Sequence, residues 1–441
     1  MRADMLGTCE RAFRDHGDVV RVRLGPPRVG RELTFAFHPD AAHHILAGHA
    51  ANYRKDTVFY AEVRDAFGDG LLTSQDGDWQ RQKRFLQPLF TPRRVAGYAD
   101  LITGQVDETI ARWRATPSAE RDMHAEMTRL TLRVVCRALF GNDADQALPV
   151  VRRWFGPLGE SVRHRSMSPI RLPSSVPTPV NRRLARARGE LVALCDQIIR
   201  DRRAAAAASS GPDLLGLLID ARDDGTALTD AEVRDQVLIF LLAGHETTST
   251  ALTYALYLLG RHRSAQERIR TDPAYATLVI KETMRLFPSA PLTGRRSVAD
   301  DEIGGYHIPG GTDVIISPWV THRHPAFWDS PATFDPERFT PERERARHRY
   351  AWYPFGGGPR ACIGQHFSML ESEIALNRLV AAFDLTAADR MPGYTNQITL
   401  RPTEPVLVRV APIGHPAVTT GTVPGMPGPG VTSANQRSGL R

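Results

Sequence analysis

Lysine and cysteine are scarce in this chain. Its lysines are Lys55, Lys83 and Lys281, and the rest of the positive charge is arginine spread over many segments. The net charge of +7 permits acidic partners, but no basic module typical of nucleic-acid binding is present, so we expect no nucleic-acid partner. The four cysteines, Cys9, Cys136, Cys195 and Cys362, lack CxxC spacing. This argues against a disulfide framework and favours a reducing, cytoplasmic location.

The chain also lacks a long uninterrupted apolar run. The N-terminus has no stretch that resembles a signal peptide or anchor. The segment from Val237 to Leu259 approaches membrane-spanning length, but polar side chains from His245 to Thr250 fill its centre and would be costly in hydrocarbon. We therefore predict a buried helix and no membrane anchor.

The periodicity predicts a mainly helical fold with a smaller β region. Alternating apolar residues indicate paired strands near residues 20–24 and 33–37, and further strands near 303–306 and 314–316. The pattern from Pro39 to Phe287 is mostly helical, and Thr229 and Glu232 form a capping box at the start of the long apolar helix. We expect one domain over residues 1–412, a mobile connection at 204–212 and a disordered tail over 413–441.

The most informative stretch runs from Phe355 to Gly364 and contains one cysteine after three consecutive glycines. Glycines let a backbone approach a flat ligand closely. The apolar residues after Cys362 recur at a helical period, which places the thiol near a helix N-terminus, where a thiolate is favoured. A single cysteine suits a haem iron better than zinc or an iron–sulfur cluster, which need several ligands.

This stretch resembles the haem-binding segment of the cytochrome P-450 superfamily. The fixed positions of that segment are matched by Phe355, Gly358, Arg360, Cys362 and Gly364. The resemblance extends over about residues 12–412. It implies a single large helical domain with small β-sheets, haem b with Cys362 as the thiolate ligand of the iron, and O2 as co-substrate.

A second motif, Ala243 to Thr248, lies midway along the long apolar helix. Its polar side chains can open the helical hydrogen-bond ladder locally. Gly244 removes a side chain where a small ligand would need room. Glu246 and Thr247 supply an acid and a hydroxyl, the minimum for relaying protons through water. By resemblance, both residues are catalytic: Thr247 would hydrogen-bond the bound dioxygen and Glu246 would help to deliver protons for cleavage of its O–O bond. A helix kink satisfied by water is the alternative.

Two further segments resemble the structural network of the family. Glu282 and Arg285 lie three residues apart and therefore on one helix face. Arg338, in a segment that reads Phe-Asp-Pro-Glu-Arg-Phe, is the implied third member. On residue types alone the first two are a common solvated pair; by resemblance all three hold the cysteine loop and do not react.

Haem propionates need cationic partners, and arginine suits carboxylates. Arg360 is the first candidate by motif position, and Arg295 the second, with Arg296 as an alternative. Trp79 and Lys83 resemble a Trp-xxx-Arg element with lysine in the last place. The full set expected to bind the cofactor is Trp79, Lys83, Ala243, Gly244, Arg295, Phe355, Gly356, Arg360, Cys362 and Gly364.

The positions expected to line the substrate pocket are almost all apolar, so we predict a hydrophobic substrate. They comprise the loop before Trp79, the long helix and the segment after the Glu282 helix. Ordinary core packing is the alternative for about half of them. The residues are Phe59, Phe67, Leu71, Leu72, Phe240, Ala243, Ala290, Leu292 and Thr293.

Together these features predict a bacterial haem-thiolate monooxygenase that hydroxylates or epoxidises an apolar small molecule, most simply in secondary metabolism. Nothing in the chain resembles a flavin or ferredoxin domain, so electrons from NAD(P)H must arrive through a separate ferredoxin and ferredoxin reductase. We expect a monomer. The alternatives are a fatty-acid or steroid hydroxylase, a peroxygenase or isomerase that needs no external electrons, and a haem protein that binds a ligand without turnover.

Overall fold

The computed structural model describes residues 4–24, 31–116, 120–166, 168, 173–204 and 213–413. The expected mobile connection, apart from Ala204, and the expected tail, apart from Ile413, lie outside these residues. Both therefore stay predictions.

The described part of the chain is dominated by helices. They are α1 (Met5–His16), α2 (Pro39–His43), α3 (Val58–Phe67), α4 (Asp76–Leu86), α5 (Pro92–Ala96), α6 (Ala99–Arg114), α7 (Met123–Phe140), α8 (Ala144–Ser166), α9 (Pro179–Ala204), α10 (Leu214–Asp220), α11 (Asp230–Arg261), α12 (Arg263–Thr271), α13 (Tyr275–Leu286), α14 (Pro318–Thr321), α15 (Pro341–Ala346) and α16 (Gln365–Ala382). A π-helical turn, His44–Gly48, follows α2 directly.

The strands are short. They are β1 (Val19–Leu24), β2 (Arg31–Ala36), β3 (Tyr53–Arg54), β4 (Glu120–Asp122), β5 (Arg222–Asp223), β6 (Thr226–Ala227), β7 (Thr293–Ser297), β8 (Asp301–Ile303), β9 (Tyr306–Ile308), β10 (Asp313–Ile316), β11 (Phe383–Ala387), β12 (Tyr394–Asn396), β13 (Leu400–Pro402) and β14 (Leu407–Pro412). The prediction of a mainly helical chain with a smaller β region is confirmed.

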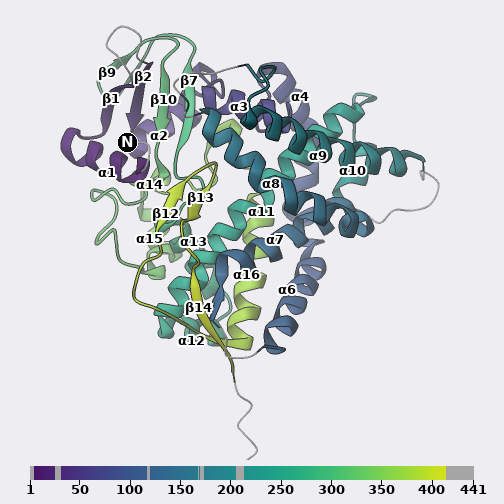
Figure 1. Ribbon diagram of the computed structural model, residues 1–441. Coiled ribbons are helices and arrows are strands. Elements are labelled where there is room, and N and C mark those ends of the chain that lie inside the picture. Colours follow the sequence, from purple (N-terminus) through teal and green to yellow (C-terminus); the bar gives the residue numbers. More distant parts are fainter. Residues whose placement is uncertain are drawn as a thin grey trace, which may run out of the picture.

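The largest sheet has the strand order β1-β2-β10-β7-β3 and lies at the side of the molecule that carries the N-terminus (Figure 1). The predicted pair near the N-terminus is β1 and β2, which run antiparallel with Val20 opposite Phe35. Strand β10 joins β2 in parallel and β7 in antiparallel orientation. Strand β7 also pairs with β3, which brings residues 293–297 beside residues 53–54, although about 240 positions separate them in the chain.

Helix α11 crosses the centre of the helical region (Figure 1). It begins with the predicted capping box, because Thr229 Oγ1 accepts from the Glu232 N–H and the Glu232 carboxylate accepts from the Thr229 N–H. Its first half, to Leu242, packs in one hydrophobic cluster with α7 to α10, and its second half, from Ala251, packs in another with α13 and α16. The polar residues between them therefore lie where the two cores meet.

The polar residues in its middle do not interrupt α11. The helix is continuous from Asp230 to Arg261. The hydroxyl groups of Thr247, Thr250 and Thr253 donate to carbonyl groups four residues earlier, so each is satisfied within the helix. No helix of the described residues is both long and apolar enough to pass through a bilayer.

Candidate active site

A cavity of about 1620 Å³ lies between the Cys362 loop, α11 and the large sheet. Its size exceeds the roughly 300–1,000 Å³ of ordinary ligand pockets. The Cys362 loop forms one wall and the middle of α11 another, and the other elements that border the cavity include α3, α4, α7, β7 and the β12–β13 hairpin. The cavity can therefore hold a large flat group together with a second molecule.

The loop that carries Cys362 is shaped by two glycines that no other residue could replace without strain. Gly356 has φ of 70° and Gly358 has φ of 62°. A Cβ atom at Gly358 would lie 1.8 Å from the carbonyl oxygen of Leu46, in the π-helical turn. Because glycine alone tolerates both the conformation and the contact, the loop packs flat against that turn.

Cys362 lies at the end of this loop, just before α16 begins at Gln365. Its N–H donates to the Phe355 carbonyl oxygen at 2.8 Å, which closes the loop, and its side chain is exposed to the cavity. The surrounding protein raises the pKa of the Cys362 thiol by burial, whereas the Gly364 N–H and the Lys55 charge act in the opposite direction. The sulfur of Cys362, a soft ligand atom, therefore faces the cavity.

Cationic side chains gather on the cavity wall without carboxylate partners. Lys55 and Arg295 are 8% and 4% exposed, and no ion pair to either is present within the described ranges. Arg295 donates only to neutral oxygens, those of Thr293, Gly294 and Tyr60. The pKa of Lys55 is well below its usual value because of burial, followed by the charges of Arg295 and Arg360.

Buried cations without counter-charges are costly, so this wall fits a dianionic group. A haem with its two propionates meets that requirement, and the thiol of Cys362 supplies the iron ligand. Lys55 was not expected from the sequence. The sequence could have indicated it, because Lys55 is one of only three lysines in an arginine-rich chain. Its position close to Arg295, however, follows only from the β3–β7 pairing.

The structure separates the two candidate arginines of β7. Arg296 forms an ion pair with Asp313 at 2.8 Å, whereas no carboxylate of the described residues pairs with Arg295. Arg360 donates to the Ser74 carbonyl oxygen at 2.8 Å, and its guanidinium lies 4.6 Å from the Trp79 ring centre. Burial, and then the charge of Arg295, lower its pKa to about 10.

The other expected cofactor-binding residues also border the cavity. Lys83 does so, but its ammonium donates to the Pro359 carbonyl oxygen at 2.9 Å and so binds the loop backbone. Gly244 differs from expectation, because a Cβ atom there would meet Val135 at 2.9 Å. Its missing side chain makes room for α7 to pack on α11 more than for a ligand.

The acid and the alcohol of α11 face different directions. Thr247 borders the cavity, and its hydroxyl donates to the Ala243 carbonyl oxygen at 2.7 Å. Glu246 is buried beside it, forms an ion pair with Arg401 and accepts from the Thr399 hydroxyl at 3.1 Å. Consecutive helical residues point about 100° apart, and here Thr247 borders the cavity whereas the Glu246 side chain turns toward Arg401 and Thr399. Thr399 borders the cavity and links Glu246 to it.

Most of the residues expected in the substrate pocket line the cavity. They are Phe59, Leu71, Leu72, Phe240, Ala243, Ala290, Leu292 and Thr293. Phe67 does not: it is wholly buried in the hydrophobic core. The segment expected as a loop contains helix α3, and Phe67 is its last residue, about 12 Å along the helix axis from Phe59. At that end of α3, Phe67 packs in the hydrophobic cluster that α7 to α10 also form.

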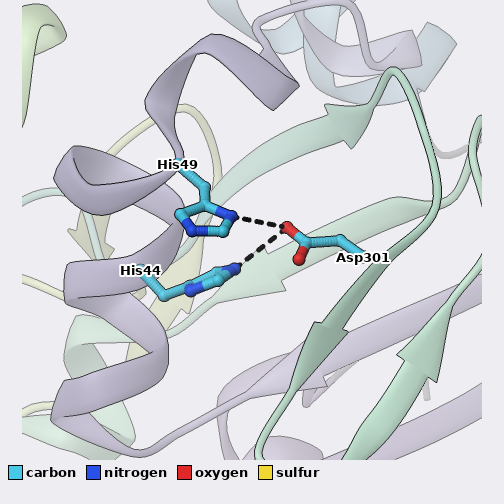
Figure 2. Close-up of side chains that lie close together, drawn as sticks. All are labelled: His44, His49 and Asp301. Atoms are coloured by element: carbon cyan, nitrogen blue, oxygen red, sulfur yellow. Dashed lines mark hydrogen bonds and ion pairs between the residues drawn. The ribbon is translucent and has the colours of Figure 1, made fainter.

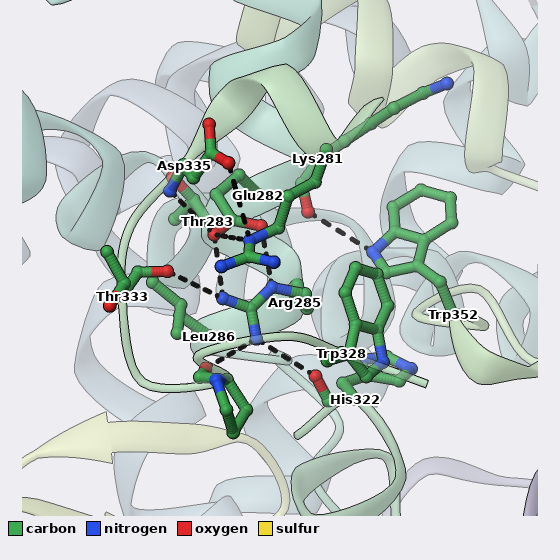
Figure 3. A network of polar contacts seen from close by, with 12 residues as sticks. Lys281, Glu282, Thr283, Arg285, Leu286, His322, Trp328, Thr333, Asp335 and Trp352 are labelled. Carbon is green, nitrogen blue, oxygen red and sulfur yellow. Dashed lines mark hydrogen bonds and ion pairs between the residues drawn. The ribbon is translucent and has the colours of Figure 1, made fainter. Parts of the chain in front are cut away.

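The Glu282–Arg285 pair is fully closed off from solvent on α13 (Figure 3). Arg285 donates twice to the Glu282 carboxylate, at 2.6 and 2.7 Å, and its other N–H groups donate to backbone carbonyls of residues 322, 331 and 333. Arg338 lies 3.6 Å from the same carboxylate. The ring of His322 accepts from the Tyr353 N–H at 2.9 Å, which connects this network to the segment entering the cysteine loop.

Comparisons with known proteins agree with this geometry. The family model described as Cytochrome P450 matches residues 2–410. The chain belongs to the cytochrome P-450 family. It is 36% identical to cyclooctatin synthase of Streptomyces melanosporofaciens, with 82% of this chain and 81% of that protein covered. It is 32% identical to cyclooctat-9-en-7-ol 5-monooxygenase of the same organism, with coverage of 86% and 84%.

A third relative is pentalenene oxygenase of Streptomyces avermitilis, at 30% identity with 84% and 85% covered. Among solved structures, the cytochrome P450DA haem domain superposes with a TM-score of 0.82 at 28% identity and covers 92% of each chain. This cytochrome P-450 is therefore a haem-thiolate monooxygenase of bacterial secondary metabolism. It inserts one atom of O2 into an apolar small molecule and takes electrons from NAD(P)H through redox partners. The peroxygenase and isomerase alternatives are not favoured.

Proposed function

We propose that the substrate is a terpenoid, a cyclic hydrocarbon or its mono-alcohol, and that the product is an alcohol or epoxide. The apolar wall of the cavity carries this proposal. Phe59, Leu71, Phe240 and Ile398 border the space on the α11 side of the Cys362 loop. The names of two relatives support it, because one name contains cyclooctat-9-en-7-ol and the other contains pentalenene.

The protein residues would divide the work around the haem. Bound haem supplies the oxidising chemistry, and the sulfur of Cys362 donates electron density to its iron. Lys55, Arg295 and Arg360 would hold the propionates. Thr247 would turn its hydroxyl from the Ala243 carbonyl into the cavity and donate a hydrogen bond there. Glu246 is paired with Arg401, so it would first take up a proton from solvent water and then pass it through the Thr399 hydroxyl toward the cavity. The apolar wall would exclude bulk water.

An optical titration of the purified ferric protein tests the substrate class. Pentalenene and cyclooctat-9-en-7-ol should shift the haem from low to high spin, because a substrate that fills the cavity displaces water. Fatty acids, steroids and macrolides of similar size should shift it at least tenfold less at equal concentration. A shift with fatty acids or steroids alone would overturn the proposal and favour the hydroxylase alternative.

The proton-delivery role is tested separately by Thr247→Ala. We expect the variant to consume reductant at a rate close to wild type. Most of the O2 that it reduces should be released as hydrogen peroxide. Thr250→Ala is the matched control, because Thr250 has the same side chain but is buried against the backbone of Leu400. Unchanged coupling of reductant to product in Thr247→Ala would contradict the assignment.

We further propose a monomer in a reducing cytoplasm that receives electrons from a small acidic ferredoxin and its reductase. The net charge of +7 supports an acidic partner, and the four cysteines are free thiols, three of them buried. Omission of the ferredoxin from a reconstituted assay should abolish turnover. Full turnover with the reductase alone would refute this partner.

A further inference from the structure

Two histidines and an aspartate meet outside the haem cavity, at the edge of the β8–β9 hairpin (Figure 2). His44 Nε2 lies 2.9 Å from Asp301 Oδ2, and His49 Nδ1 lies 3.5 Å from the same oxygen. One ligand atom from each of the three residues lies within 4.8 Å of the others. None of them takes part in the haem site described above.

The local backbone explains why the two histidines face the same way. In an α-helix, residues five positions apart point about 140° from each other. Here the His49 N–H donates to the His44 carbonyl oxygen at 2.7 Å, so the turn closes over five residues. The two imidazole rings consequently lie over one another, with centroids 4.0 Å apart. Such π-helical turns are rare overall, and many of those that occur lie at functional sites.

The spacing suits a transition metal ion. Tetrahedral ligands at about 2.0–2.2 Å from zinc lie about 3.3 Å from each other. The two observed distances to Asp301, 2.9 and 3.5 Å, bracket that value. Two imidazole nitrogens with one carboxylate oxygen form a donor set that suits zinc and its neighbours. A water molecule would complete the fourth position.

The carboxylate is already oriented by hydrogen bonds from neighbouring residues. Tyr53 donates to Asp301 Oδ2 at 2.9 Å, and Asn52 does so at 3.4 Å. The Glu302 N–H donates to the other carboxylate oxygen at 2.8 Å. Supporting hydrogen bonds of this kind fix metal ligands and tune them. The His49 side chain is 57% exposed, which gives an ion a path from solvent.

We propose that His44, His49 and Asp301 form a second metal site, which binds a divalent transition metal such as Zn²⁺. The site has a structural connection to the haem loop, because the Leu46 carbonyl oxygen in the same π-helical turn packs against Gly358. An ion that clamps the turn to β8 therefore stabilises the surface on which the Cys362 loop rests.

Equilibrium dialysis of the haem-loaded full chain against Zn²⁺, with metal analysis, tests the site. Wild type should bind one Zn²⁺ at least tenfold more tightly than His49→Gln, which removes an exposed ligand and should fold normally. His307→Gln is the matched control. His307 lies in the same hairpin and pairs with Asp300 at 3.2 Å, but among the residues that the structure describes no second histidine joins this pair. This control should keep wild-type affinity.

Thermal unfolding gives a second readout. Zn²⁺ should raise the melting temperature of wild type and of His307→Gln, but not of His49→Gln, because binding to the folded state alone stabilises it. Equal zinc affinity in wild type and His49→Gln, or equal thermal shifts, would show that the three residues form a hydrogen-bonded cluster only and would overturn the proposal. Neither readout depends on substrate or turnover.

Discussion

Two groups of buried cations in this protein are built in opposite ways. On α13, every N–H direction of Arg285 finds an oxygen, and a carboxylate balances its charge inside the core. On the cavity wall, Lys55 and Arg295 are almost as deeply buried, yet their contacts within the described residues are neutral oxygens and an aromatic ring. The charge and the hydrogen bonds of Arg285 are therefore satisfied by the protein itself, without a ligand.

The difference separates a structural role from a binding role. A buried charge that the protein neutralises itself holds the fold together, and its loss exposes an uncompensated partner. A buried charge that the protein leaves unbalanced lowers stability until an anion binds. Breaking the first group should therefore lower the free energy of unfolding of the haem-free chain, whereas removing the second should raise it.

The largest effect is expected for Glu282→Ala. The change leaves Arg285 buried without its counter-charge, and breaking a buried pair costs about 3–5 kcal/mol. Denaturant unfolding should show this loss in the free energy of unfolding. The control is Glu267→Ala, which breaks the exposed pair with Arg263 and should leave the free energy of unfolding almost unchanged. Similar unfolding free energies for the two variants would remove the contrast between the α13 network and an ordinary surface pair.

The next effect concerns haem retention in Arg295→Leu. A hydrogen bond to a charged group contributes about 1.5–3 kcal/mol, so haem should bind at least about tenfold more weakly. Transfer of haem to an acceptor protein measures this loss. Arg296→Leu is the neighbouring comparison: it should lower stability, because it removes the Arg296 ion pair of the buried Asp313, but it should release haem more slowly than Arg295→Leu. Faster haem loss from Arg296→Leu than from Arg295→Leu would reverse the assignment of the two arginines.

A smaller effect is the pH dependence of the haem-free chain. Burial and the neighbouring charges of Arg295 and Arg360 depress the pKa of Lys55 in the folded state. Between that depressed pKa and the unfolded value near 10.4, the unfolded chain binds more protons, so stability rises with pH. Lys55→Met should remove this rise and raise the stability at neutral pH. A Lys55→Met variant that is less stable than wild type without haem would contradict the description of the cavity wall.

Local patterns predicted much of this molecule, and tertiary contacts account for what they missed. The Gly-rich cysteine loop, the paired strands of residues 19–36 and the capping box at Thr229 depend on neighbouring residues, so the sequence reveals them directly. Lys55 was missed because its position beside Arg295 requires strands far apart in the chain to pair. Phe67 was misplaced because periodicity alone does not show how far along α3 the cavity extends, and Phe67 at the end of that helix packs in the core.

The most direct test of the central claim compares haem with its dimethyl ester, in which both propionates are neutral. If Lys55 and Arg295 are unbalanced until the propionates bind, wild type should prefer haem by roughly 100-fold, about tenfold for each cation. The Lys55→Met, Arg295→Leu double variant should bind the two forms within about tenfold of each other. Equal binding of haem and its ester by wild type would contradict the account.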